Sequence, residues 1–230
     1  MDIIFHWHAF VEINNFEYSI LIDPFIKWNK LCDVTVNEIC KKNIKAIIVT
    51  HWHLDHIGDT VEIAQRTWTK VISTYEVIQY FEKYHWLSNT HSMHIWWKFK
   101  FDLFSVKFVN AIHWGSIWKE MLPGKAAWVI VEIWWNKIYH AWDTALHLDM
   151  KLIWSEWISV AFLPIWDNFT MWIEDAVKAV EFIKPRIVVP IHYRTFDLIK
   201  ADPIKFAHSV TLLNLATCKV LEPWQSIVIK

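Results

Sequence analysis

Three histidines and one aspartate lie within six residues, in the segment THWHLDHIGD at positions 50–59. Neutral imidazole and carboxylate are ligands that zinc and related divalent metals take in proteins. In a chain with 13 histidines, an H-x-H-x-D-H pattern would arise by chance about two times in a thousand. We therefore interpret His51, His53, Asp55 and His56 as metal ligands and not as a solvated polar loop.

Three further candidate ligands each stand one to three residues beyond a predicted strand, where loops gather at one edge of a sheet. They are His113 after the strand ending at Asn110, Asp143 after the strand 137–140, and His192 after the strand 187–189. A single histidine after a strand is more often a hydrogen-bonded structural residue than a ligand. Their shared placement favours a second set of ligands.

The elements that must position these residues begin with three β-type runs, at residues 3–6, 10–13 and 18–22. A buried strand at 44–49 leads into the histidine loop, which opens a helix running to about Arg66. The last third alternates strands and helices. This order predicts an α/β fold with two mixed sheets packed face to face and helices outside. Because no segment has the composition of a linker, we expect residues 1–230 to form a single domain.

Composition excludes several classes of protein. The net charge of −1 gives no electrostatic reason to expect nucleic acid or an anionic membrane as a partner. No window approaches 18 apolar residues, so no transmembrane helix is expected. The N-terminus lacks the basic region of a secretory leader, and three cysteines without CxxC spacing favour a reducing cytoplasm. We expect a small-molecule substrate, and the apolar content would allow a homo-oligomer.

The ligand candidates, in this order along the chain, resemble those of the metallo-β-lactamase superfamily over nearly the whole length. The closest branch comprises small metal-dependent hydrolases related to L-ascorbate-6-phosphate lactonase. The segments that carry this resemblance are WHA (7–9), LIDPF (21–25), the cluster itself, HAWDT (140–144), LPIWDNFTM (163–171) and IHYRTF (191–196). Residues 51–56 are specific to the superfamily, and the segments around Asn168 and His192 are specific to the branch.

The resemblance implies a four-layer αβ/βα sandwich with a dinuclear site at its edge. It assigns His51, His53 and His113 to one metal ion. It assigns Asp55, His56 and His192 to the other, with Asp143 bridging the two. Zinc is the first choice, and manganese, nickel and iron stay open because a nitrogen and oxygen site selects weakly among them. Di-iron oxidoreductases of the superfamily typically have glutamate at the position of His53, which favours a hydrolase here.

The expected chemistry is hydrolysis by a metal-bridging hydroxide acting on a small phosphodiester, lactone or related ester. Asp55, His56 and Asp143 are the catalytic candidates, and Asp55 can orient the nucleophile and shuttle its proton. Asp59 and His140 are candidates for hydrogen bonds that fix the tautomers of the ligand imidazoles, with ordinary capping as the alternative.

Three residues are candidates for contact with the substrate, and they are His8, Asn168 and Arg194. Arg194 lies two residues after a ligand, and its fork of donors would suit a carboxylate or phosphate. An ordinary surface arginine is an equal alternative.

Glycine and tryptophan have abnormal counts, with 3 glycines and 18 tryptophans, where average usage predicts about 16 glycines. The resemblance places glycine where this chain has Trp7, Trp52, Trp68, Trp86, Trp96, Trp97, Trp128, Trp142, Trp166, Trp172 and Trp224. The segments Trp134-Trp135-Asn136 and Pro223-Trp224-Gln225 also read as turns that suit glycine.

One hypothesis for these tryptophans is a UGA codon that the cell reads as glycine. The alternatives are deliberate replacement of glycine by tryptophan and genuine aromatic core residues. With genuine tryptophans beside the ligands, the chain would be a metal-binding protein without turnover. A di-iron redox enzyme is the third functional alternative.

Overall fold

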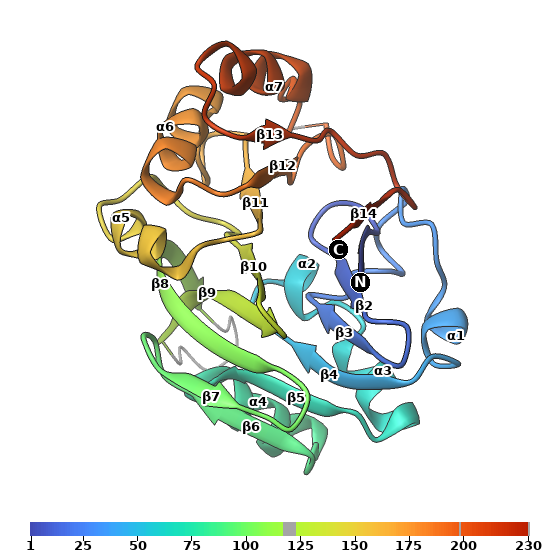
Figure 1. The fold of residues 1–230 in the computed structure, drawn as a ribbon. Coiled ribbons are helices and arrows are strands. Elements are labelled where there is room, and N and C mark those ends of the chain that lie inside the picture. The colour runs from blue at the N-terminus through green and yellow to red at the C-terminus, as the bar shows by residue number, and fades with distance from the viewer. Residues whose placement is uncertain (117–122, 198, 230) are drawn as a thin grey trace. The chain divides into compact units, whose positions relative to one another are not determined.

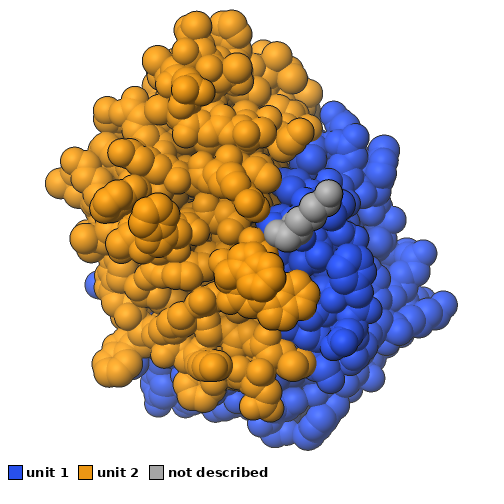
Figure 2. Space-filling view, viewed as in Figure 1, with its two compact units in different colours: residues 1–94, 114–125, 221–230 blue, residues 95–113, 126–220 orange. Residues whose placement is uncertain are grey.

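The computed structural model describes residues 1–116, 123–197 and 199–229. The chain forms two compact units (Figures 1 and 2). Unit 1 comprises residues 1–94, 114–125 and 221–230, and unit 2 comprises residues 95–113 and 126–220. Within the described ranges, no helix has the length and apolar character needed to cross a membrane.

Unit 1 is built on a seven-stranded sheet with the order β14-β1-β2-β3-β4-β5-β6. Its strands are β1 (Asp2–Phe5), β2 (Val11–Asn14), β3 (Ser19–Ile22), β4 (Ile44–Ile48), β5 (Lys70–Thr74), β6 (Thr90–Met93) and β14 (Ser226–Val228). Strands β14 and β1 to β3 pair antiparallel, whereas β3 to β6 pair parallel. The carboxyl ends of β3, β4 and β5 therefore meet at one edge of this mixed sheet.

The helices among the described residues of unit 1 are α1 (Val36–Ile39), α2 (Leu54–Ile57), α3 (Thr60–Thr67) and α4 (Tyr75–His85). Apolar residues of α3 and α4, such as Ile63 and Phe81, share one core cluster with Ile47 and Val71 of the sheet. Both helices are amphipathic, so their apolar stripes cover one face of the sheet and leave the polar side to solvent.

The helix predicted to run from the histidine loop to Arg66 is broken at Gly58. Gly58 has φ +40°, and a Cβ there would lie 2.4 Å from the Pro24 carbonyl oxygen. Only glycine tolerates this combination of backbone conformation and close approach. The break separates the single turn α2, which carries Asp55 and His56, from α3.

Unit 2 contains the second seven-stranded sheet, with the order β13-β12-β11-β10-β9-β8-β7. Its strands are β7 (Lys98–Lys100), β8 (Ser105–Ser116), β9 (Pro123–Ile133), β10 (Asn136–His140), β11 (Val160–Pro164), β12 (Ile187–Ile191) and β13 (Thr217–Cys218). Strand β9 pairs antiparallel with β10, whereas β10 to β13 pair parallel. This sheet is also mixed.

The helical elements of unit 2 are α5 (Met150–Ile153), the 3-10 turn η1 (Trp154–Glu156), α6 (Ile173–Ile183) and α7 (Pro203–Leu212). Helix α6 packs against both α5 and α7, and its buried stripe includes Ala176, Val180 and Ile183. The expectation of two mixed sheets with helices is confirmed. The single domain stays a prediction.

Candidate metal centre

The histidine cluster of unit 1 follows β4 directly, as its position after a buried strand predicts. Strand β4 lies beside the parallel strand β3, with Ile48 paired to Ile22. Asp23 follows β3 and Thr50 follows β4, so the two residues lie side by side at the end of the sheet. The loop that carries the ligands is therefore anchored to the end of a second strand.

Asp23 forms the centre of a buried hydrogen-bond network. Its Oδ1 accepts from the backbone N–H of Thr50 at 2.8 Å, and its Oδ2 accepts from the Thr50 hydroxyl at 2.5 Å. The same Oδ2 accepts from His56 Nδ1 at 2.9 Å. Burial raises the pKa of the Asp23 carboxyl, and the hydrogen bonds from His56 and Thr50 oppose that rise. Asp23 and His56 are both fully buried.

This network sets the tautomers of two candidate ligand histidines. Because His56 donates from Nδ1, its Nε2 offers a lone pair. The Thr50 hydroxyl donates its hydrogen bond to Asp23. The Thr50 oxygen therefore accepts a hydrogen bond from His51 Nδ1, which lies 3.1 Å away. His51 therefore also presents an unprotonated Nε2. A carboxylate behind a ligand imidazole is the usual support of a protein metal site.

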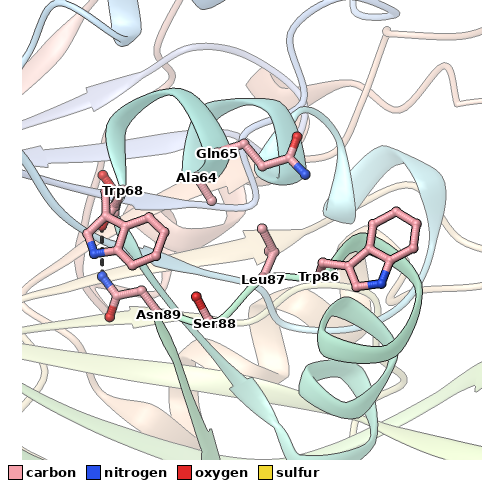
Figure 3. A pocket seen from close by; sticks show the side chains of 8 residues that line it. Ala64, Gln65, Trp68, Trp86, Leu87, Ser88 and Asn89 are labelled. Carbon is pink, nitrogen blue, oxygen red and sulfur yellow. Dashed lines mark hydrogen bonds between the residues drawn. The ribbon is translucent and has the colours of Figure 1, made fainter.

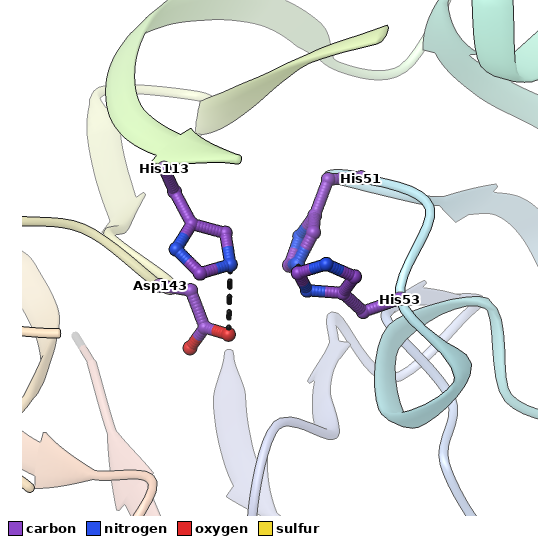
Figure 4. Close-up of side chains that lie close together, drawn as sticks. All are labelled: His51, His53, His113 and Asp143. Carbon is purple, nitrogen blue, oxygen red and sulfur yellow. Dashed lines mark hydrogen bonds and ion pairs between the residues drawn. The ribbon is translucent and has the colours of Figure 1, made fainter. Parts of the chain in front are cut away.

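The donor atoms of unit 1 fit a metal ion. His51 Nε2 lies 2.9 Å from His53 Nδ1, and Figure 4 shows the two rings next to each other. Two nitrogens bound to one ion at zinc–nitrogen distances would be about 3 Å apart. Asp55 Oδ2 lies 3.5 Å from His56 Nε2, so a second pair of donors forms beside the first.

In unit 2, Asp143 lies between two histidines. Its Oδ2 is 3.4 Å from His113 Nε2, the contact drawn in Figure 4. Its Oδ1 is 3.1 Å from His192 Nε2. Each carboxylate oxygen thus faces a different imidazole, and all three side chains are almost completely buried. This arrangement suits a carboxylate that contributes one oxygen to each of two ions.

The strands of unit 2 explain this arrangement. His192 directly follows β12 and Asp143 follows β10, and both strands pair parallel with β11 between them. A backbone bond joins the Ala145 N–H to the Ile112 carbonyl at 3.1 Å, which ties the Asp143 loop to the end of β8. His113 is the next residue of β8. Asp143 and His192 follow their strands as predicted, whereas the prediction that His113 follows a strand ending at Asn110 is wrong, because β8 continues to Ser116.

Four of the predicted site residues have a left-handed backbone, and one of them is Asn168, with a φ of 61°. The φ angles of the other three are 56° at His8, 59° at His192 and 60° at Arg194. Residues with a Cβ that is neither Asn nor Asp rarely adopt this conformation, and such strain concentrates at functional sites. The surrounding structure therefore holds these residues in place at an energetic cost.

The three residues predicted to contact the substrate differ in their surroundings. His8 is completely buried, and its Nε2 lies 3.0 Å from Asp55 Oδ2, so it reaches the ligand cluster of unit 1. Asn168 and Arg194 are exposed in loops of unit 2. The Arg194 guanidinium is 3.9 Å from the Asp202 carboxylate, which offsets part of its charge. Their contact with substrate stays a prediction.

The prediction that Asp59 fixes a ligand imidazole is wrong. Its Oδ2 accepts from the backbone N–H groups of Ile26 at 2.9 Å and Lys27 at 3.0 Å. These bonds hold the loop after β3, so Asp59 makes ordinary structural hydrogen bonds and does not cap α3 with its side chain. His140 is buried, with its ring 4.0 Å from that of Trp142.

The roles of Asp23 and Thr50 were not predicted from the sequence. Asp23 fills the supporting position that was assigned to Asp59. The available signal was its place directly after a predicted strand, at the same kind of position that identified the ligands. Without the pairing of β3 with β4, nothing linked Asp23 to the histidine loop.

The beta-lactamase superfamily domain matches residues 18–193 of the chain. The chain belongs to the metallo-β-lactamase superfamily. A UPF0173 metal-dependent hydrolase from Staphylococcus aureus strain JH9 is 40% identical over 233 residues, which cover 99% of each protein. The chain is thus a member of the superfamily's metal-dependent hydrolases.

Solved structures with the same fold include Igni18, a metallo hydrolase from the archaeon Ignicoccus hospitalis. It is 30% identical, with a TM-score of 0.90 over 100% of this chain and 98% of that one. CmlA, a diiron β-hydroxylase from Streptomyces venezuelae, is 11% identical with a TM-score of 0.73, over 99% of this chain and 54% of that one. At this identity CmlA shows a shared fold only. The expected superfamily fold is confirmed.

Proposed function

We propose that this protein hydrolyses a small phosphodiester, lactone or related ester with hydroxide held between two divalent metal ions. The observation that carries the proposal is Asp143, whose two oxygens each face the Nε2 of a different histidine. A carboxylate in this arrangement suits a bridge between two ions, and two-ion sites of this kind catalyse hydrolysis.

The proposed ligand sets follow the resemblance to the superfamily. His51, His53 and His113 would hold one ion, and Asp55, His56 and His192 the other. The contacts within unit 1 support this division, because His51 faces His53 whereas Asp55 faces His56. Zinc is the proposed metal, since the donors are imidazole nitrogens and carboxylate oxygens.

Two bound divalent cations would lower the pKa of a shared water and so supply hydroxide at neutral pH. The protein's own residues would orient and deprotonate that water. Asp55 has its Oδ2 near both His8 and His56, and its carboxylate would accept a proton from the nucleophile. The Asp23 network would keep His51 and His56 in the tautomers that bind metal.

The test is a metal-loaded activity panel of bis-p-nitrophenyl phosphate and several lactones. It should use the chain with tryptophan and the chain with glycine at positions 7, 52, 68, 86, 96, 134, 157 and 224. We expect metal-dependent turnover that His56→Ala abolishes, while Lys205→Ala on the exposed surface leaves turnover intact. Metal binding without turnover by the glycine-containing chain would contradict the proposal, as would two coupled irons with redox activity.

A further inference from the structure

Tryptophan occupies backbone positions in this chain that favour glycine. Among the described residues, sixteen other than glycine have a positive φ, and seven of these are tryptophan. They are Trp7 (80°), Trp68 (56°), Trp86 (53°), Trp96 (70°), Trp134 (57°), Trp157 (58°) and Trp224 (66°). L-residues with a Cβ seldom adopt this region, which glycine enters without steric cost.

The local roles of these positions are also those of glycine. Trp68 and Trp86 end helices α3 and α4 as left-handed C-caps, and Trp157 does the same for η1. A left-handed glycine is the usual residue just beyond a helix. Trp134 opens the two-residue turn between β9 and β10, where hairpins prefer residues that accept a positive φ.

The indole rings at these positions do not form a core. Six of the seven left-handed tryptophans are exposed, from 38% at Trp96 to 83% at Trp86. An exposed ring provides little burial of apolar surface to offset a strained backbone. The alternative that these tryptophans are genuine core residues is therefore contradicted at six positions, and Trp7 is the buried exception.

Trp52, between two ligand histidines, shows crowding of another kind. Its ring centroid lies 3.6 Å from that of Tyr80, with the planes tilted by 58°. Aromatic pairs normally keep their centroids about 4.5–7 Å apart. The indole therefore has too little room, although the Trp52 backbone is not left-handed.

A surface groove in unit 1 also depends on tryptophan. Trp68 and Trp86 line it together with Ala64, Leu87 and Asn89 (Figure 3). The Trp68 carbonyl accepts from Asn89 Nδ2 at 2.7 Å, a backbone contact that glycine would preserve. With glycine at both positions the groove would lose two of its walls, so we assign it no ligand.

We propose that the protein made in its own cell carries glycine at the seven left-handed tryptophans and at Trp52, because UGA codons there are decoded as glycine. Genetic codes exist in which UGA means tryptophan and others in which it means glycine, so the wrong table would exchange the two. Glycines such as Gly58 would then come from ordinary glycine codons. Its φ of +40° shows the same backbone requirement met by the expected residue.

Tandem mass spectrometry of the protein isolated from its organism tests the proposal directly. We expect glycine in the peptides that cover the eight positions, with each site lighter by an indolylmethyl group. The gene should have TGA at the same codons. Tryptophan in these peptides, or TGG in the gene, would overturn the proposal.

A stability comparison tests the structural argument with matched sets of six exposed residues. One chain replaces the left-handed tryptophans 68, 86, 96, 134, 157 and 224 by glycine. The control replaces the exposed tryptophans 28, 97, 114, 135, 154 and 172, whose φ is not positive. We expect the first set to raise the thermal unfolding temperature and the control not to. An equal or greater gain in the control would refute the argument.

The second inference concerns His8 and does not depend on tryptophan. The fully buried His8 ring places Nε2 at 3.0 Å from Asp55 Oδ2. Its ring centroid lies 5.5 Å from that of Phe25, which packs against one side. The left-handed φ of 56° at His8 indicates that the chain keeps this orientation despite backbone strain.

The geometry points to His8 as a positioning residue for Asp55, and this inference rests on the proposed function. An Nε2–H donated to Oδ2 would fix the rotation of the Asp55 carboxylate. A histidine that is fully buried and already bonded to a ligand carboxylate is better suited to orienting that ligand than to contacting substrate. This changes the role that sequence analysis expected for His8.

The test compares His8→Gln, whose amide can replace the Nε2–H donor, with His8→Leu, which fills the space without a donor. We expect His8→Leu to weaken zinc binding by about 10- to 100-fold and to lower kcat with little change in KM. His8→Gln should retain most of both. The unfolding temperature of the metal-free protein should be similar in the two variants.

Equal losses in His8→Gln and His8→Leu would overturn the inference, as would unchanged zinc affinity in His8→Leu. The zinc affinity of the variants tests whether His8 positions Asp55 even if the protein hydrolyses none of the substrates offered. Failure of the proposed function and failure of the His8 inference are therefore distinguishable.

Discussion

Replacing Asp23 by asparagine should weaken metal binding through the tautomer of His56. The Asp23 Oδ2 accepts from both the Thr50 hydroxyl and His56 Nδ1, while Oδ1 accepts from the Thr50 N–H. An asparagine cannot accept at both positions. Its NH2 group must face either the Thr50 N–H, which is also a donor, or His56 Nδ1. In the second case His56 becomes protonated on Nε2 and loses the lone pair that binds metal.

The size of the effect follows from the contacts. Hydrogen bonds to a charged group contribute about 1.5–3 kcal/mol each, and a buried donor left without its acceptor costs about 1–3 kcal/mol. Disruption of a carboxylate behind a metal-ligating histidine typically weakens metal binding by about 10- to 100-fold. We therefore expect Asp23→Asn to lose about 1.4–2.8 kcal/mol of zinc affinity.

Competition with a chromophoric chelator measures this affinity, and nitrogen chemical shifts of His56 report its tautomer. Asp59→Asn is the matched control, because the Asp59 carboxylate bonds the backbone of Ile26 and Lys27 and no ligand histidine in the described contacts. It should keep zinc affinity within about twofold, well under the tenfold that 1.4 kcal/mol represents. Unchanged affinity in Asp23→Asn, with His56 still protonated on Nδ1, would refute the reasoning.

Three further changes have defined outcomes. Burial would raise the pKa of Glu12, but hydrogen bonds from His6 and other partners lower it to about 2. The ionised Glu12 carboxylate therefore stabilises the folded protein above the unfolded pKa of about 4.3, and this stabilisation is lost as pH falls towards 2. Glu12→Gln should accordingly flatten the fall in urea midpoint between pH 5 and 3. Gly58→Ala should lower the free energy of unfolding by about 2 kcal/mol or more, because its Cβ would overlap the Pro24 carbonyl; an unchanged urea midpoint would contradict this. His192→Ala should abolish turnover while the far-ultraviolet circular dichroism stays unchanged, and retained turnover would remove it from the ligand set.

The sequence was most informative where spacing and local context coincide. The residues His51 to His56 could be identified because four ligand-type residues follow one buried strand within six positions. The two-sheet architecture followed from the order of strands and helices. The turn at Trp134 was also predictable, because it separates two β-type runs and has φ 57° in the structure.

What could not be predicted depends on contacts between distant parts of the chain. Asp23 and Thr50 are 27 residues apart, and only the pairing of β3 with β4 brings them together. Asp59 was assigned to the imidazoles because it is close in sequence, whereas its carboxylate turns towards the backbone of the preceding loop. The break at Gly58 likewise depends on the Pro24 carbonyl, which no local pattern reveals.

Zinc titration of the metal-free protein by calorimetry tests the central claim most directly. If Asp143 bridges two ions, the glycine-containing chain should bind two zinc ions, and Asp143→Asn should weaken both binding events together. A stoichiometry of one or none in the unmodified site, or a variant that loses only one of two independent ions, would contradict the account.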